Sequence, residues 1–239
     1  MKILILGGTA DARELAERLT ALGHDVTTSL AGRTRQPAMP AGQMRVGKFG
    51  GIPGLVGYLK AAGIERLVDA TDPYAGLISI NAVAAAQASG VPLVRLMRPA
   101  WQEPDGAGWV HVPSARAAAD ALPPNAHGFI TTGPDELEHF VLRDDCRLVA
   151  RLSESPTIDL GPVAVLQDAP PYALDDERAL FAKHGFTHLV TKNAGGEATR
   201  ATLDVASERG ARVIMVARPV YGPAREVGSV EEAVRAITS

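Results

Sequence analysis

Hydrophobic positions follow two periodicities along the chain. Short apolar runs, typical of buried parallel strands, alternate with longer segments in which apolar residues recur at helical spacing. The first pair is the run at residues 3–6 and, two glycines later, a helix with Ala12, Leu15 and Leu19 on one face. The same alternation continues to residue 237 and predicts an α/β fold with parallel sheets.

These elements group into two predicted domains. The first has strands at 3–6, 25–30, 44–46, 67–70 and 92–96. The second has strands at 109–112, 129–132, 148–152, 163–166, 188–191 and 213–217. A turn-rich stretch at 103–108 favours a boundary between them. We therefore predict an α/β protein with two Rossmann-like parallel-sheet domains, residues 1–100 and 101–239, and an interdomain cleft.

The turn after the first strand carries candidate chemistry. Gly7, Gly8, Thr9 and Ala10 form a variant of the dinucleotide-binding fingerprint between a strand and a helix. Such a turn directs backbone N–H groups and the positive end of the helix dipole at a phosphate. The alternative interpretation is the first turn of any α/β domain.

The end of the second strand bears on the choice of cofactor. An NAD enzyme usually carries Asp or Glu there to accept from the ribose 2′-hydroxyl. This chain instead has Ser29, Arg33 and Thr34, which could bind a 2′-phosphate, Arg33 through its fork of donors. The residues favour NADPH over NADH; a solvated loop arginine is the alternative for Arg33.

Other loops end strands at the same predicted sheet edge. Phe49, Gly50 and Gly51 lie in a glycine-rich loop that permits close backbone approach to a ligand. The stretch that follows the fourth strand presents Thr71, Asp72 and Tyr74 there. In the second domain, residues 131–133 and 191–196 each end a strand and precede a helix. Arg98 follows a strand of the first domain, and Arg218 follows a strand of the second. Arginines at the carboxyl ends of strands suit a ligand with several carboxylates. The candidate residues for that ligand are Arg98, Thr132, Lys192, Asn193, Gly195, Gly196 and Arg218.

Composition narrows the class of protein. The chain has 239 residues, is 46% hydrophobic and carries a net charge of −3, so no basic excess indicates a nucleic-acid partner. Its single cysteine and the spacing of its six histidines predict no metal site and no disulfide framework. No apolar stretch approaches membrane-spanning length, and no signal peptide precedes the first strand. We expect a cytoplasmic protein without a membrane partner. The absence of Walker and nucleophile-elbow motifs disfavours hydrolysis.

The chain resembles the precorrin-6A reductases of corrin (vitamin B12) biosynthesis over essentially its whole length. Six segments carry this resemblance in the family's order, and together they are specific. They are 3–16 (ILILGGTADARELA), 29–34 (SLAGRT), 46–51 (VGKFGG), 69–75 (DATDPYA), 95–101 (RLMRPAW) and 189–196 (LVTKNAGG).

The resemblance implies a cytoplasmic oxidoreductase that uses NADPH, without metal or flavin, to reduce one double bond of a polycarboxylate tetrapyrrole, precorrin-6A, to the dihydro product precorrin-6B. We place the pyrophosphate on residues 7–10, the 2′-phosphate on Ser29, Arg33 and Thr34, and residues 49–51 and Thr71 beside the cofactor. The interdomain cleft would hold the macrocycle, and the candidate residues for the carboxylate ligand, from Arg98 to Arg218, would bind its carboxylates. Asp72 and Tyr74 are candidates for ordering water or supplying the proton.

Three positions depart from the family pattern, and two alternatives stay open. Asp72 stands where histidine is usual, Ala194 where serine is usual and Thr202 where lysine is expected. The substrate could instead be the cobalt complex of precorrin-6A. A non-catalytic nucleotide- or tetrapyrrole-binding protein is the alternative of a different class. A general carbonyl reductase is disfavoured, because no tyrosine stands four residues before a lysine.

Overall fold

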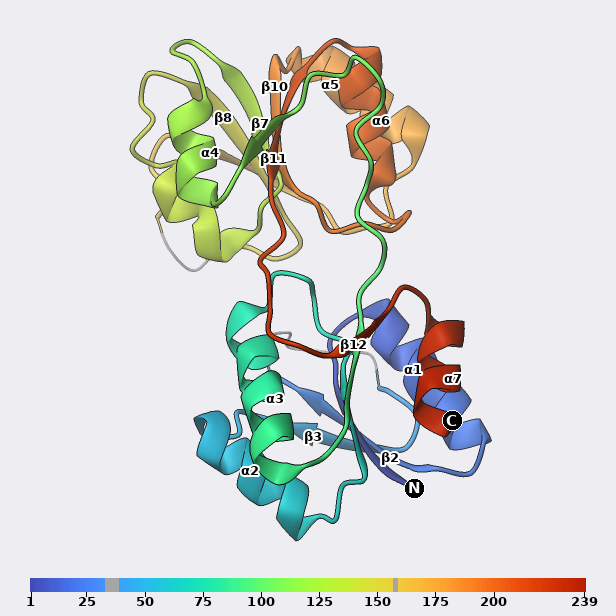
Figure 1. The fold of residues 1–239 in the computed structure, drawn as a ribbon. Coiled ribbons are helices and arrows are strands. Elements are labelled where there is room, and N and C mark those ends of the chain that lie inside the picture. The colour runs from blue at the N-terminus through green and yellow to red at the C-terminus, as the bar shows by residue number, and fades with distance from the viewer. Residues whose placement is uncertain (33–38, 157–158) are drawn as a thin grey trace. The chain divides into compact units, whose positions relative to one another are not determined.

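The computed structural model describes residues 1–32, 39–156 and 159–239. The chain divides into two compact units: residues 1–99 with 219–239, and residues 100–218. Within the described residues, each unit is built on one six-stranded sheet whose neighbouring strands all run parallel. Helices cover both faces of each sheet (Figure 1). The predicted α/β fold with two Rossmann-like parallel sheets is confirmed.

The first sheet has the strand order β12-β5-β4-β1-β2-β3. Its strands are β1 (Lys2–Leu6), β2 (Asp25–Leu30), β3 (Gln43–Val46), β4 (Arg66–Asp69), β5 (Leu93–Leu96) and β12 (Arg225–Val227). Its helices are α1 (Ala10–Ala21), α2 (Gly51–Ala61), α3 (Gly76–Ser89) and α7 (Val230–Thr238). This is the strand order of a dinucleotide-binding fold, and its switch point lies between β1 and β4.

The central strand β1 separates two hydrophobic cores. Ile3 and Ile5 pack with α1 and α7, whereas Leu4 and Leu6 pack with α2 and α3. All four side chains are at most 1% exposed. Figure 1 shows the two pairs of helices on opposite faces of the sheet. Because side chains of a strand alternate between faces, burial on both sides explains the wholly apolar run.

Residues 219–239 belong to the first unit, and not to the second domain as was predicted. The sequence assigned 101–239 to the second domain, but β12 pairs with β5 in the first sheet and α7 packs against α1. The strand β12 has only three residues, Arg-Glu-Val, of which two are exposed. It therefore lacks the apolar run from which the other strands were predicted, and its pairing with β5 was not foreseen.

The second sheet has the order β6-β11-β10-β7-β8-β9. Its strands are β6 (Val110–Val112), β7 (His127–Ile130), β8 (Arg147–Leu152), β9 (Ala164–Gln167), β10 (His188–Lys192) and β11 (Arg212–Val216). Its helices are α4 (Ala115–Ala121), the 3₁₀ helix η1 (Pro134–His139), α5 (Leu174–His184) and α6 (Arg200–Glu208). As written, this order corresponds strand by strand to that of the first sheet: β6 takes the place of β12, and β10 and β7 take the places of β4 and β1 at the switch point.

Candidate active site

The first βα turn requires glycine at two positions for different reasons. A Cβ atom at Gly7 would lie 2.8 Å from Thr28 Cγ2 on the neighbouring strand β2. Gly8 has a φ of 124°, a conformation that side-chain-bearing residues rarely adopt. The chain therefore turns sharply at the carboxyl end of β1, and its backbone is open to a ligand at the switch point.

Thr9 fixes the start of α1. Its Oγ1 accepts from the N–H of Ala12 at 3.1 Å and donates to the carbonyl oxygen of Ala70 at 2.9 Å. The first bond caps the helix, and the second ties the turn to the end of β4. The N–H groups of Ala10 and Asp11 follow in the first turn, where a helix lacks acceptors of its own. These are the groups that bind phosphate in folds of this type.

Ser29 and Arg45 meet at the ends of β2 and β3. They are direct partners in the strand register, and Arg45 Nη1 donates to Ser29 Oγ at 2.8 Å. Arg45 also donates to the carbonyl oxygens of Gly47 at 3.0 Å and Lys48 at 3.3 Å. Across residues 1–32, 39–156 and 159–239, no carboxylate forms an ion pair with Arg45. A cation therefore sits beside the residue predicted to bind the ribose end of the cofactor.

Arg45 is a candidate that the sequence analysis missed. Arg33 and Thr34, which were predicted to bind the 2′-phosphate with Ser29, lie outside the described residues. Arg45 sits inside a short strand, so its position along the chain gave no hint of a loop ligand. The pairing of β2 with β3 was the signal that could have found it, because it places Arg45 opposite Ser29.

Phe49 of the glycine-rich loop has its ring in contact with Arg45 and Tyr58. Arg45 Cζ lies 3.8 Å from the centroid of the Phe49 ring, and Tyr58 meets that ring edge-on at 5.3 Å. Gly50 and Gly51 have φ angles of 83° and 80°, and Gly50 is the N-cap of α2. The loop thus holds Phe49 against the guanidinium of Arg45 and against α2.

The loop after β4 holds the predicted proton donors. Buried Asp69 accepts from the hydroxyl of Thr71 at 2.7 Å, which fixes Thr71 at the strand end. Asp72 is exposed, and its Oδ1 accepts from the N–H of Tyr74 at 2.8 Å. Tyr74 is half-buried. Both candidates therefore lie on one short turn at the switch-point edge.

A buried ionic network supports this loop from the C-terminal segment, and the sequence analysis missed it. Arg95 is 1% exposed; its Nε donates to Asp69 Oδ2 at 3.3 Å and its Nη1 to Glu226 Oε1 at 2.9 Å. The ring of Tyr221 lies over the guanidinium, and its hydroxyl donates to the carbonyl oxygen of Pro73 at 2.8 Å. Burial and the neighbouring carboxylates raise the pKa of Tyr221, so its phenol keeps its proton.

Two predicted substrate residues lie at the second switch point, on β10 and just after β7. Thr132 is 3% exposed, and its Oγ1 has no hydrogen-bond partner within the described residues. Lys192 ends β10, and its Nζ lies 2.9 Å from Glu136 Oε1 of η1. A carboxylate ligand at Lys192 would therefore compete with the protein's own Glu136.

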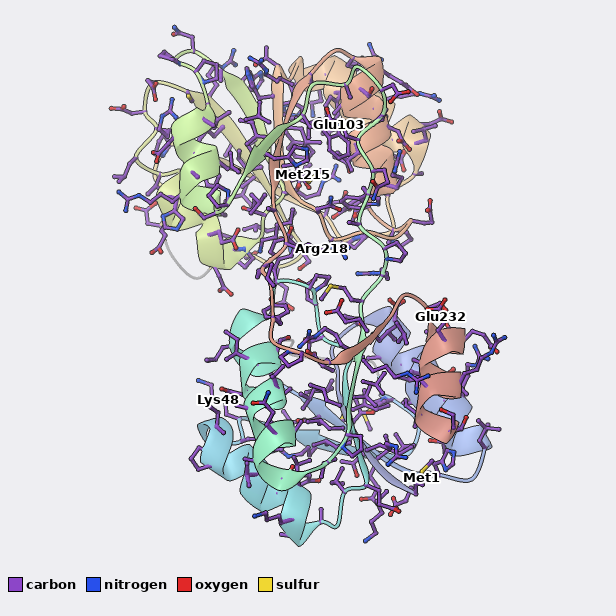
Figure 2. All side chains as sticks on the ribbon, viewed as in Figure 1. Met1, Lys48, Glu103, Met215, Arg218 and Glu232 are labelled. Atoms are coloured by element: carbon purple, nitrogen blue, oxygen red, sulfur yellow. The ribbon has the colours of Figure 1, made fainter. Side chains whose placement is uncertain are left out.

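Asn193 forms hydrogen bonds with residues near both ends of the second unit. Its Oδ1 accepts from the N–H of Trp101 at 2.8 Å, and its Nδ2 donates to the carbonyl oxygen of Trp101 at 3.0 Å. Its own carbonyl oxygen accepts from Arg218 Nε at 2.6 Å. Figure 2 shows Arg218 beyond the carboxyl end of β11. Gly195 and Gly196 have φ angles of 72° and 80°, and the carbonyl of Gly196 accepts from the indole of Trp101.

Arg98 differs from the other predicted substrate residues in belonging to the first unit. Its Nε lies 3.5 Å from Asp11 Oδ2, in the first turn of α1. The pair offsets a negative charge that would otherwise lie beside the candidate phosphate-binding turn.

Ala194 and Thr202 are the two residues of the second unit that depart from the family pattern, and both lie in or against its interior. Ala194 packs against a hydrophobic core, and Thr202 is 5% exposed. The hydroxyl of Thr202 lies 3.5 Å from Nη1 of buried Arg151, which also binds Glu177 Oε1 at 2.5 Å and lies under the Tyr172 ring. A lysine at 202 would place a second cation beside Arg151.

Among the described residues, no group of three or more His, Cys, Asp or Glu side chains is placed to hold a metal ion. No helix in the same part of the chain is both long and apolar enough to cross a membrane.

Comparison with known proteins gives a consistent result. The model of the family "Precorrin-6x reductase CbiJ/CobK" matches residues 2–238. A precorrin-6A reductase of Rhodococcus erythropolis is 40% identical over 94% of this chain and 92% of its own. A cobalt-precorrin-6A reductase of Priestia megaterium is 28% identical over 99% and 98%. The solved structure of a CobK precorrin-6A reductase superposes with a TM-score of 0.92 at 34% identity, over 100% of this chain and 96% of that one.

Proposed function

Because the chain belongs to the precorrin-6x reductase family, we propose that it reduces one double bond of metal-free precorrin-6A with NADPH. Family membership makes it an oxidoreductase of cobalamin biosynthesis that uses a nicotinamide cofactor. The observation that carries the proposal is the edge of the first sheet. The turn at residues 7–10, the Ser29–Arg45 pair and the loop at 69–75 lie there, at the carboxyl ends of β1, β2, β3 and β4.

The choice of NADPH rests on charge. An NADH site usually presents a carboxylate at the end of β2, whereas this site presents Ser29 and the guanidinium of Arg45. Arg45 can donate to a phosphate in a bidentate manner. Within the described residues its acceptors are a hydroxyl and two carbonyl oxygens, all neutral, so its positive charge would attract a 2′-phosphate.

The choice of the metal-free substrate rests on relative similarity. Relatives named precorrin-6A reductase are 37–40% identical to this chain, whereas those named cobalt-precorrin-6A reductase are 27–28% identical. All of these alignments cover nearly the whole chain, so the difference favours the metal-free macrocycle.

The chain's own residues bind and orient the reactants. Bound NADPH supplies the hydride. The turn at residues 7–10 offers N–H groups to its pyrophosphate, and Arg45 with Ser29 holds its 2′-phosphate. Asp72 and Tyr74 are placed to order water or to transfer the proton that the reduced macrocycle takes up. In the second unit, Thr132, Lys192 and Arg218 provide donors for substrate carboxylates.

The test is an anaerobic assay with NADPH and metal-free precorrin-6A, followed at the nicotinamide absorbance and in the macrocycle spectrum. We expect coupled loss of NADPH and of the precorrin-6A spectrum, with slower turnover when NADH replaces NADPH. Turnover with cobalt-precorrin-6A alone would reassign the substrate. Binding of both reactants without oxidation of NADPH would refute the reductase and favour a carrier.

A further inference from the structure

The segment that returns from the second unit to the first is fixed against the loop at 69–75. The carbonyl oxygen of Gly222 accepts from Arg95 Nη1 at 3.3 Å. A Cβ atom at Gly222 would lie 2.9 Å from Val83 Cγ1, so the segment is pressed onto α3. The ring of Tyr221 lies against Gly76, in the first turn of that helix.

Tyr221 binds the loop directly. Its hydroxyl donates to the carbonyl oxygen of Pro73, the residue between Asp72 and Tyr74. The turn has its own bonds as well: Asp72 Oδ1 accepts from the N–H of Tyr74, and the Asp72 carbonyl accepts from the N–H of Ala75 at 2.8 Å. These internal bonds set the shape of the turn, whereas the bond from Tyr221 attaches its middle to the rest of the unit.

The cofactor side of the loop is held separately. Thr71 is fixed by Asp69, and Asp69 by Arg95. Removing the hydroxyl of Tyr221 leaves those bonds in place. The bond that is lost joins Tyr221 to Pro73, between Asp72 and Tyr74, so any displacement should fall on that part of the turn and leave Thr71 in place.

We propose that Tyr221 is a positioning residue for the reduction, which holds Asp72 and Tyr74 in register with the reactants through the carbonyl of Pro73. The proposal rests on the proposed function, because it assigns the proton-transfer step to this loop. A misplacement of about 1 Å costs up to about a hundredfold in rate, so loss of one anchoring bond is expected to slow turnover about tenfold.

The test compares Tyr221→Phe with Tyr172→Phe. Tyr172 is a matched control, because it also lies over a buried arginine, Arg151, with Cζ 3.9 Å from its ring, and burial also raises its pKa. It belongs to the second unit, whereas the loop belongs to the first. We expect Tyr221→Phe to lower the single-turnover rate of NADPH oxidation with precorrin-6A about tenfold. The Kd for NADPH should be unchanged, and the Tm should fall by no more than a few degrees, as the loss of one hydrogen bond predicts. Tyr172→Phe should keep the wild-type rate.

Hydrogen exchange at the amides of residues 74–76 supplies a readout that needs no substrate. Tyr221→Phe should speed exchange there and Tyr172→Phe should not. An unchanged rate, unchanged exchange, or a fall in rate accompanied by weaker NADPH binding and a larger fall in Tm would overturn the proposal. A wild-type protein that does not oxidise NADPH would refute the reductase instead, while the exchange data would still decide whether Tyr221 anchors the loop.

Discussion

Replacing Arg45 with methionine tests the origin of cofactor preference. The substitution removes the guanidinium that lies 2.8 Å from Ser29 Oγ but keeps an unbranched side chain to cover the Phe49 ring. NADPH and NADH differ only in the 2′-phosphate. If Arg45 binds that group, the variant should lose affinity for NADPH and retain its affinity for NADH.

The size of the loss follows from the geometry. A hydrogen bond to a charged group contributes about 1.5–3 kcal/mol, which corresponds to about 10- to 150-fold in Kd. One such bond is the minimum expected, since the guanidinium can present two N–H groups to a phosphate. The contact with Phe49 is half-exposed, so its loss should lower the free energy of unfolding by no more than about 1 kcal/mol.

The assay is the Kd for NADPH and for NADH, measured by nicotinamide fluorescence or calorimetry without the macrocycle. Lys48→Met is the matched control, because it removes the same unit charge from an exposed side chain three residues away. It should weaken NADPH binding much less. Equal weakening of both cofactors by Arg45→Met would refute the reasoning, since it would make Arg45 a structural residue of the loop, and an unchanged preference would do so as well.

Three further predictions concern stability. Gly54→Ala should destabilise the protein by about 1–3 kcal/mol in chemical unfolding, because its Cβ would lie 1.7 Å from the Phe49 carbonyl oxygen. Gly57→Ala, on the same helix with open space around it, should be neutral or stabilising by up to about 1 kcal/mol; equal effects would contradict the contact. Burial and nearby cations hold the pKa of His127 below its ordinary 6.5. The folded state thus binds fewer protons, so the unfolding free energy should fall as pH drops below about 6.5, and less steeply in His127→Gln. Glu177→Ala should cost about 3–5 kcal/mol, read as a large fall in Tm, because it removes the carboxylate 2.5 Å from buried Arg151 of β8 and leaves that arginine with Asp168 at 3.8 Å; a small fall would show that Asp168 or water replaces the lost carboxylate.

The sequence predicted elements where one strong pattern decided the structure. Apolar runs such as residues 3–6 are buried on both faces, so their composition alone identifies them as central strands. A helix was also predicted to follow residues 131–133, and Pro134 does begin one, but it is the 3₁₀ helix η1.

The missed residues are those whose role depends on pairing between distant segments. Arg45 is defined by its strand partner Ser29, and Tyr221 by Pro73, which lies 148 positions earlier in the chain. Asn193 shows the opposite case. A polar residue after a strand suggested a ligand, but both polar atoms of its side chain bind the main chain of Trp101. Residue type and strand position cannot distinguish these two uses of an amide.

The ion pairs of the arginines explain why Arg45 is the residue to test first. Fully buried Arg95 and Arg151 each contact two carboxylates, and partly exposed Arg98 pairs with Asp11. Those pairs serve the fold, since a buried charge is costly without a partner. Arg45 is half-buried, lies on an aromatic ring and binds only neutral oxygens among the described residues. The fold supplies this charge with hydrogen-bond acceptors but with no carboxylate among the described residues, which is the reason to test whether it serves an anionic ligand at the end of β2.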